Sequence, residues 1–292
     1  MVLESLITPF KAENKPWEMM LFGFLYSLVS FLLAVAIFGQ KYASLIAVFL
    51  TVLASVPLVY NTIKLEEKKD EADYDERIIL REHSRAIAVF MFLFFGITLS
   101  FSVLFVLFSF FPGMLSFVSG QSFNTTQLFS PQLDTISSIN GRATSTGFFF
   151  VIFLNNLNVL LFCILFSFVY GLGAIFILTW NASVIGVAIG SFVYNGLKAA
   201  SSYAFSSKIA ASTLVVLKGL FMYSIHGFFE VLAYFIAGLA GGIISVAVIK
   251  HSFGTKKFEK IVVDTADLFI ISLVVLFIAA LLEVFVTPLF FG

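Results

Sequence analysis

The sequence is poor in charge, in cysteine and in histidine, and each shortage excludes a class of protein. Only 12% of its 292 residues are Asp, Glu, Lys or Arg, whereas 60% are hydrophobic. A soluble domain carries about 25% charged residues, so the composition excludes an ordinary soluble fold. The formal net charge is zero, which argues against nucleic acid as a partner. The single cysteine, Cys163, cannot form an intrachain disulfide and is expected to be a small buried hydrophobe.

Long apolar runs predict an all-α polytopic membrane protein, because about 20 apolar residues suffice to span a bilayer. The expected helices cover residues 17–38, 42–63, 86–111, 147–179, 183–194, 226–249 and 263–285. The first run lacks a clear cleavage site, so we expect a mature transmembrane helix and no signal peptide. Pro57 is expected to kink or end the second helix, and Asn181 to mark a turn. Residues 209–224 are interrupted by Lys218 and Gly219, which favours a short or re-entrant helix. The predicted fold therefore has about seven transmembrane helices plus this segment.

Polar stretches divide the chain and indicate its orientation. Lys and Arg concentrate in 1–16, 64–85 and 250–260, which the positive-inside rule assigns to the cytoplasm. We therefore expect a multi-pass protein of the cell membrane with a cytoplasmic N-terminus. The expected regions are an interfacial segment and hairpin (1–63), a charged cytoplasmic helix or loop (64–85), one span (86–111), an extracytoplasmic polar loop (112–146), a membrane core (147–249), and a basic loop with the last span (250–292). The sequon Asn124-Thr125-Thr126 agrees with an exterior position of the polar loop.

The charged stretch 64–85 mixes both signs, which is typical of a solvated helix. Arg77, Arg81 and Arg85 recur every four residues and form a basic stripe that could contact anionic lipid headgroups. His83 lies in the same stretch and is expected to be a surface histidine.

An ionisable pair lies inside the apolar stretch 223–242. His226 and Glu230 are four residues apart, so a helix places them on one face. A carboxylate is costly in lipid and must meet a partner or water. Asn155 and Asn156, near the start of the 147–179 run, carry amides that usually hydrogen-bond a neighbouring helix.

Small residues recur where helices are expected to approach closely. Gly186 and Gly190 form one GxxxG pattern, and Gly238 and Gly242 form another. Gly171, Gly173 and Gly227 are expected to be helix-packing glycines as well. Such faces also favour a homo-oligomer.

The two blocks FLNNLNVLLFCILFSFVYGLGAIFILTWNASVIGVAIG and IHGFFEVLAYFIAGLAGG resemble the stage II sporulation protein M family, also called DUF95. The family motif is an asparagine pair, a glycine-rich turn, HG-x-x-E and a small-residue tail. Here it falls on Asn155, Asn156, Gly171, Gly173, Asn181, His226, Gly227 and Glu230, within residues 150–245. The resemblance implies a membrane scaffold that recruits partner enzymes. Relatives occur in organisms that form no spores, including archaea, so it does not imply sporulation.

Three interpretations of the polar residues stay open. In the first, Glu230 and His226 bond each other or the asparagine amides and tie helices together, as a scaffold requires. In the second, the His226/Glu230 pair serves a small transporter or channel. In the third, the protein is an intramembrane hydrolase, although HGFFE supplies two ligands where catalytic zinc usually has three. We favour a non-enzymatic scaffold without catalytic residues, metal or cofactor, whose partners are the lipid bilayer, further copies of the chain and an unknown protein.

Overall fold

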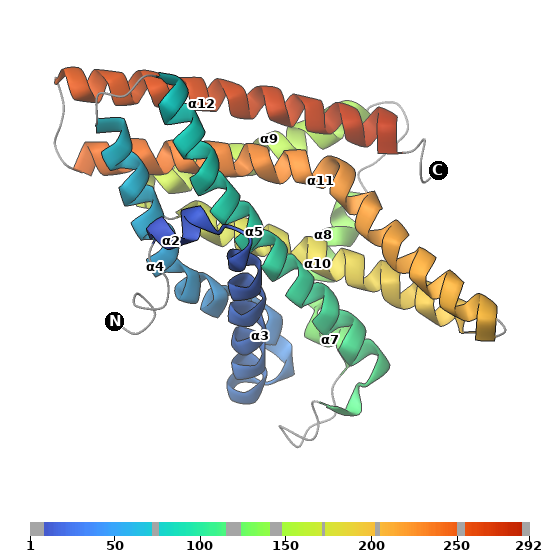
Figure 1. Ribbon diagram of the computed structural model, residues 1–292. Coiled ribbons are helices and arrows are strands. Elements are labelled where there is room, and N and C mark those ends of the chain that lie inside the picture. Colours follow the sequence, from blue (N-terminus) through green and yellow to red (C-terminus); the bar gives the residue numbers. More distant parts are fainter. Residues whose placement is uncertain are drawn as a thin grey trace.

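The computed structural model describes residues 9–71, 76–114, 124–140, 148–170, 173–201, 205–249 and 255–287, and its elements are all helices (Figure 1). Seven helices of these ranges are long and apolar enough to cross a membrane, which confirms the predicted fold class. They are α3 (Glu18–Phe38), α4 (Ala43–Glu71), α5 (Glu76–Phe110), α9 (Phe148–Tyr170), α10 (Gly173–Ala200), α11 (Phe205–Ile249) and α12 (Lys256–Leu281). The short elements are α2 (Pro9–Asn14), the 3-10 turn η1 (Gln40–Tyr42), α7 (Thr125–Leu128), α8 (Ser130–Asn140) and the π-helical turn η2 (Leu282–Val286).

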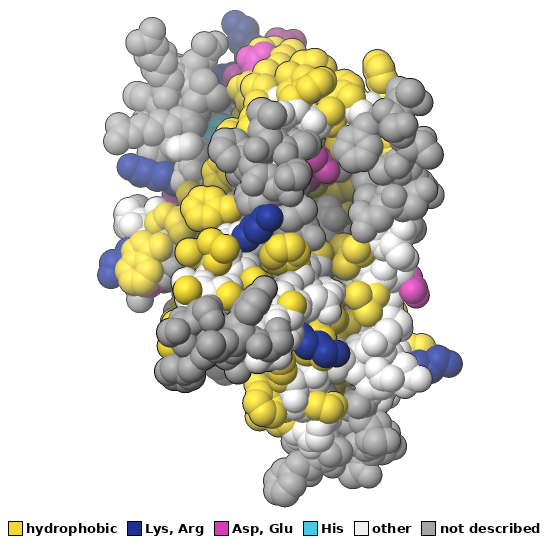
Figure 2. Space-filling view, turned by 90° about the vertical axis from the view of Figure 1, so that its right-hand side faces the viewer, with side chains coloured by type: hydrophobic (Ala, Val, Ile, Leu, Met, Phe, Trp, Pro, Cys, Tyr) yellow, Lys and Arg dark blue, Asp and Glu magenta, His cyan; other side chains and the backbone are white. Residues whose placement is uncertain are grey.

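Helices α5 and α11 form the centre of the bundle. In each of these two helices, 72% of the most apolar stretch is buried within the protein, whereas the same share is 17% in α9 and 22% in α12. Helix α5 packs along α3 and α10, while α11 packs along α9 and α12. The peripheral helices leave Leu, Ile and Phe side chains exposed, and Figure 2 shows hydrophobic side chains on the surface with Lys and Arg scattered singly among them. Lipid covers such surfaces in a polytopic protein.

Phenylalanine rings fill the contact between α3, α5 and the polar segment that follows α5. Phe31 is fully buried and stacks on Phe108 and Phe129, with ring centroids 5.8 Å and 5.3 Å apart. Phe129 lies between α7 and α8, so the segment expected as a loop (112–146) contains two short helices anchored to the bundle. Asn124 of the sequon caps α7, because its side chain accepts a hydrogen bond from the Thr126 backbone N–H.

The first helix of the predicted core ends earlier than the sequence indicated. We expected a helix over 147–179 and a turn at Asn181, but α9 ends at Tyr170 and α10 runs from Gly173 through Asn181. A Cβ at Gly173 would lie 2.4 Å from the Phe166 carbonyl oxygen, so only glycine allows α10 to start this close to α9. An asparagine costs a helix less than about 0.7 kcal/mol, which continuous packing of α10 on α5 easily offsets.

The apolar segment expected at 209–224 is present, but it is joined to the following span. Helix α11 runs for 45 residues from Phe205 to Ile249 without an interruption. In Figure 1 the end of α10 and the beginning of α11 lie together at the lower right, whereas the end of α11 and the start of α12 lie at the left. The segment Ile209–Phe221 is therefore an extension of a span and not a separate re-entrant helix. Helix α4 likewise continues through Pro57.

The charged stretch 64–85 belongs to the ends of two long helices. Helix α4 continues to Glu71 and α5 begins at Glu76. The expectation of a surface histidine there is wrong, since the side chains of His83 and Glu66 are 2% and 0% exposed. The Nδ1 atom of His83 lies 2.7 Å from Glu66 Oε2, so the pair joins α5 to α4. A buried histidine is tolerated here because this carboxylate partner satisfies it.

Candidate functional site

A polar cluster joins α9 to α11 inside the membrane-spanning part of the protein. Asn156 Nδ2 donates a hydrogen bond to Glu230 Oε1 at 2.5 Å. Asn156 is 9% exposed, and its own Oδ1 lies 3.5 Å from Asn155 Nδ2. The structure thus brings the asparagine pair and Glu230 together, although they lie more than 70 residues apart in sequence. An interhelical hydrogen bond of this kind contributes about 0.6–2 kcal/mol in a membrane.

A second carboxyl group completes the cluster. Glu283 lies in η2, and its carboxyl group lies within electrostatic reach of that of Glu230. Acidic groups inside a membrane need polar partners, and the Asn156 amide supplies one to Glu230. The cluster now spans three elements, since it connects α9, α11 and the turn after α12.

The π-helical turn sets the position of Glu283. An extra residue in the turn rotates the side chains that follow relative to those of α12, and such turns recur at functional sites. Thr287, after the turn, donates its hydroxyl to the Leu282 carbonyl oxygen at 3.2 Å. The sequence places Glu283 near the end of the last helix, but it was not predicted to join the cluster. Its position in an apolar helix could have indicated this, because an acidic residue in lipid needs a partner.

An aromatic and a thiol side chain border the carboxyl pair. Tyr234 lies one turn after Glu230 on α11, is 3% exposed, and lies within electrostatic reach of both carboxyl groups and of Cys163. Cys163 is fully buried on α9. Over the described part of the chain, no three His, Cys, Asp or Glu side chains lie close enough to hold a metal ion.

No described contact connects the remaining polar residues named from the sequence to this cluster. Asn181 lies half-buried on α10, and no described contact links it to Asn156 or Glu230. The side chain of His226 lies outside the described residues, as do those of Arg77 and Arg81. Arg85 is exposed near the start of the α5 span.

Several glycines named from the sequence lie where two helices approach closely. A Cβ at Gly186 would lie 2.5 Å from the carbonyl oxygen of Thr98. A Cβ at Gly190 would lie 2.9 Å from the carbonyl oxygen of Ser102. This GxxxG face therefore packs directly on the α5 backbone. Gly238 packs less tightly, since a Cβ there would lie 3.2 Å from the Ala174 Cβ.

Other glycines correct the sequence interpretation. A Cβ at Gly227 would meet nothing within 4 Å among the described residues, so Gly227 makes no close helix contact within that part of the chain. Gly242 is buried in α11, and Gly171 lies outside the described residues. Among the glycines that the structure describes, the closest approach lies between α3 and α5, where a Cβ at Gly23 or Gly96 would lie 2.2 Å or 2.0 Å from a backbone oxygen of the other helix. Sequence reasoning missed these two because each is a single glycine without a GxxxG partner.

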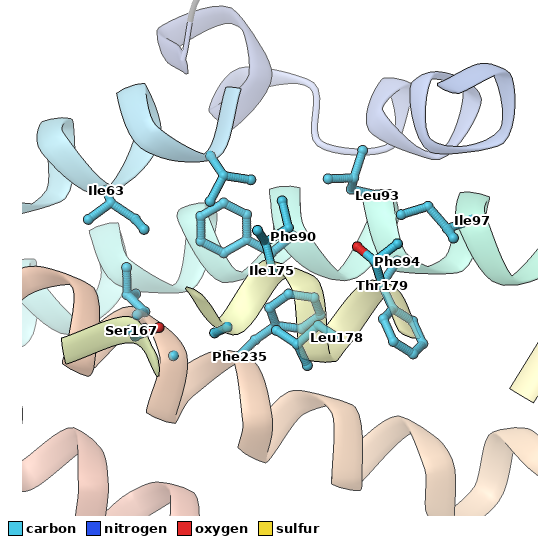
Figure 3. Close-up of a pocket in the computed structure, with 14 residues that line it drawn as sticks. Ile63, Phe90, Leu93, Phe94, Ile97, Ser167, Ile175, Leu178, Thr179 and Phe235 are labelled. Carbon is cyan, nitrogen blue, oxygen red and sulfur yellow. The ribbon is translucent and has the colours of Figure 1, made fainter. Parts of the chain in front are cut away.

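A separate pocket lies between α4, α5, α9, α10 and α11 (Figure 3). Its lining is apolar except for the hydroxyl groups of Ser167 and Thr179. Neither Asn156 nor Glu230 lines it. The polar cluster is thus built into helix contacts and not into the wall of this pocket.

Together the seven apolar helices and the intramembrane polar cluster define a multi-pass α-helical membrane protein. A family model described as stage II sporulation protein M matches residues 89–288. The chain therefore belongs to the stage II sporulation protein M family. The match includes Asn156, Glu230 and Glu283, and it extends beyond the 150–245 region that the sequence motifs indicated. No curated protein and no solved structure matches the chain.

Proposed function

We propose that this protein is a non-enzymatic membrane scaffold that holds a partner protein at the bilayer. The observation that supports this most is the hydrogen bond that Glu230 of α11 accepts from Asn156 of α9. Such a bond fixes the packing of α9 on α11, which is what a rigid platform needs. The proposal includes further copies of the chain as partners through its small-residue faces.

The proposed orientation follows the distribution of basic residues. With seven spans, the N-terminus and the α4–α5 and α11–α12 connections lie in the cytoplasm, and the 112–146 segment lies outside the cell membrane. The extension of α11 before its span then begins on the outer side. A scaffold of this orientation presents α7, α8 and the α10–α11 turn to partners outside.

A proton-coupled transporter is the second candidate, and the proximity of Glu230 and Glu283 favours it. Neighbouring carboxyl groups within a membrane are typical of proton relays. The two candidates differ in whether a proton must pass through the pair during function.

A glutamine at position 230 separates the two candidates. Its amide oxygen still accepts from Asn156, so the packing persists without an exchangeable carboxyl proton at position 230. Proximity labelling in cells that express the protein gives the partner set, and liposomes with a pH-sensitive dye give proton flux. A scaffold retains its partner set in the Glu230→Gln variant and shows no flux above protein-free liposomes. Proton flux in the wild type that Glu230→Gln abolishes would refute the scaffold and support transport.

A further inference from the structure

The chain carries two Asn-x-Ser/Thr tripeptides, and the structure places them in different surroundings. One is Asn124-Thr125-Thr126, in the segment between α5 and α9, and the other is Asn181-Ala182-Ser183, inside α10. A tripeptide of this kind is the acceptor of N-linked oligosaccharides, provided that it lies on an exposed segment outside the membrane. Exposure, backbone conformation and membrane side therefore decide whether either asparagine can accept a glycan.

The first tripeptide is exposed, and its acceptor atom points away from the contacts that hold it. Asn124 and Thr126 are exposed, and the Asn124 backbone is extended, with φ −114° and ψ 120°. Asn124 Oδ1 accepts the hydrogen bond from the Thr126 backbone N–H at 2.9 Å. The Gln40 carboxamide holds the Asn124 backbone, since its Nε2 donates to the carbonyl oxygen at 3.2 Å and its Oε1 accepts from the N–H at 3.3 Å. None of these described contacts uses Asn124 Nδ2, so a glycan on that atom would leave them all in place.

The second tripeptide is closed to modification and provides an internal comparison. Asn181 is half-buried in the middle of α10, which is one of the apolar helices long enough to span the membrane. Ser183 is fully buried, and its hydroxyl donates to the Trp180 carbonyl oxygen at 2.7 Å. A transferase that works at the membrane surface cannot reach a helical tripeptide within a span. The sequence pattern alone does not distinguish the two tripeptides, whereas their surroundings do.

The contacts of the first tripeptide place it at one surface of the membrane. Gln40, which holds Asn124, lies in η1 between α3 and α4, and Thr125 Oγ1 donates to the Phe108 carbonyl oxygen near the end of α5. The charged α4–α5 connection lies at the opposite ends of α4 and α5. The orientation given under Proposed function puts that connection in the cytoplasm and Asn124 on the outer side. The inference rests on this orientation and not on the scaffold role.

We propose that Asn124 carries an N-linked oligosaccharide. The donor is an oligosaccharide linked through its sugar C1 to a polyprenyl phosphate or diphosphate in the outer leaflet. In the transfer, the bond between C1 and the phosphate oxygen breaks, and the polyprenyl phosphate leaves with its electron pair. A bond from C1 to Asn124 Nδ2 forms, and the amide loses one proton to the transferase and then to water. The 14 residues from 111 to 124 reach up to about 45 Å when extended, so a newly inserted chain can present Asn124 clear of the bilayer.

Glycopeptide mass spectrometry of the protein purified from the membranes of its native host tests the proposal. We expect a glycan on Asn124 and an unmodified Asn181. Thr126→Ala should abolish the glycan, because the acceptor pattern needs a hydroxyl at this position, although the backbone N–H of residue 126 still donates to Asn124 Oδ1. Thr126→Ser is the matched control and should keep the glycan. Asn124→Asp keeps a side-chain oxygen that caps α7 but offers no amide nitrogen, so it should give a folded protein without a glycan.

An unmodified Asn124 in the native-host protein would overturn the inference, and so would a glycan that persists in Thr126→Ala. Labelling of a Ser137→Cys variant with a membrane-impermeant maleimide on intact cells separates the two reasons for an unmodified Asn124. Ser137 is exposed in the same segment, and the single native cysteine, Cys163, is fully buried and gives no background. Labelling without a glycan would refute the glycosylation and leave the orientation intact. Labelling only after the cells are opened would refute the orientation and the glycosylation together.

Discussion

Replacing Glu230 by leucine should destabilise the protein much more than replacing it by glutamine. Leucine removes the hydrogen bond from Asn156 and leaves this buried amide without its acceptor. An interhelical hydrogen bond in a membrane protein contributes about 0.6–1.7 kcal/mol, and a buried polar group left without a partner costs about 1–3 kcal/mol, so we expect a loss of about 1–3 kcal/mol. Glutamine keeps an acceptor for Asn156, so its cost should stay below about 1 kcal/mol.

The free energy of unfolding in detergent micelles or bicelles, measured by steric trapping, checks this difference. Glu259 provides the matched control, because it is an exposed glutamate in the first turn of α12. Its change to Leu or Gln should alter stability by no more than about 1 kcal/mol, the usual worth of an acidic residue in a first helical turn. Equal destabilisation by Glu230→Leu and Glu230→Gln would refute the reasoning, because it would mean that the hydrogen bond of Glu230 contributes nothing.

Three further predictions concern helix contacts outside the cluster. Gly96→Ala should destabilise the protein by about 1–3 kcal/mol, because the new Cβ would meet the Met20 backbone oxygen at 2.0 Å; a thermal melt in detergent no lower than that of the wild type would contradict it. Gly227→Ala should raise stability by up to about 1 kcal/mol, because open space surrounds this helical position; the same melt measures it, and a clear loss would contradict it. Glu66→Ala should cost about 3–5 kcal/mol, since it removes the carboxylate that pairs with the Nδ1 atom of the buried His83; near-native unfolding of this variant would show that the pair is dispensable.

The apolar runs predicted the fold because the bilayer leaves few alternatives to a helix for a run of about 20 apolar residues. The hydrogen bond between Asn156 and Glu230 also followed a general rule, since an amide and a carboxyl group in neighbouring spans need partners. The burial of His83 could not be read in the same way. A stretch of mixed charge does not reveal which of its side chains turn inwards, and the buried pair depends on how α4 and α5 cross.

Helix boundaries were harder to predict than helices. Asparagine is a residue type that favours turns, yet α10 continues through Asn181 because α5 packs along the length of α10. The actual break follows Tyr170 within a run that is apolar on both sides, where hydropathy has no signal. The π-helical turn that positions Glu283 is equally invisible, since a residue inserted into a helical turn leaves composition and periodicity almost unchanged.

The structural and transport interpretations of the carboxyl pair make different demands on Glu230. In a scaffold its side chain has to accept the hydrogen bond from Asn156, which an amide oxygen at the same position also does. In a transporter a proton must pass through the pair, which an amide cannot carry. Glu230→Gln keeps the acceptor and abolishes the exchange, so what survives in that variant belongs to packing and what is lost belongs to proton movement.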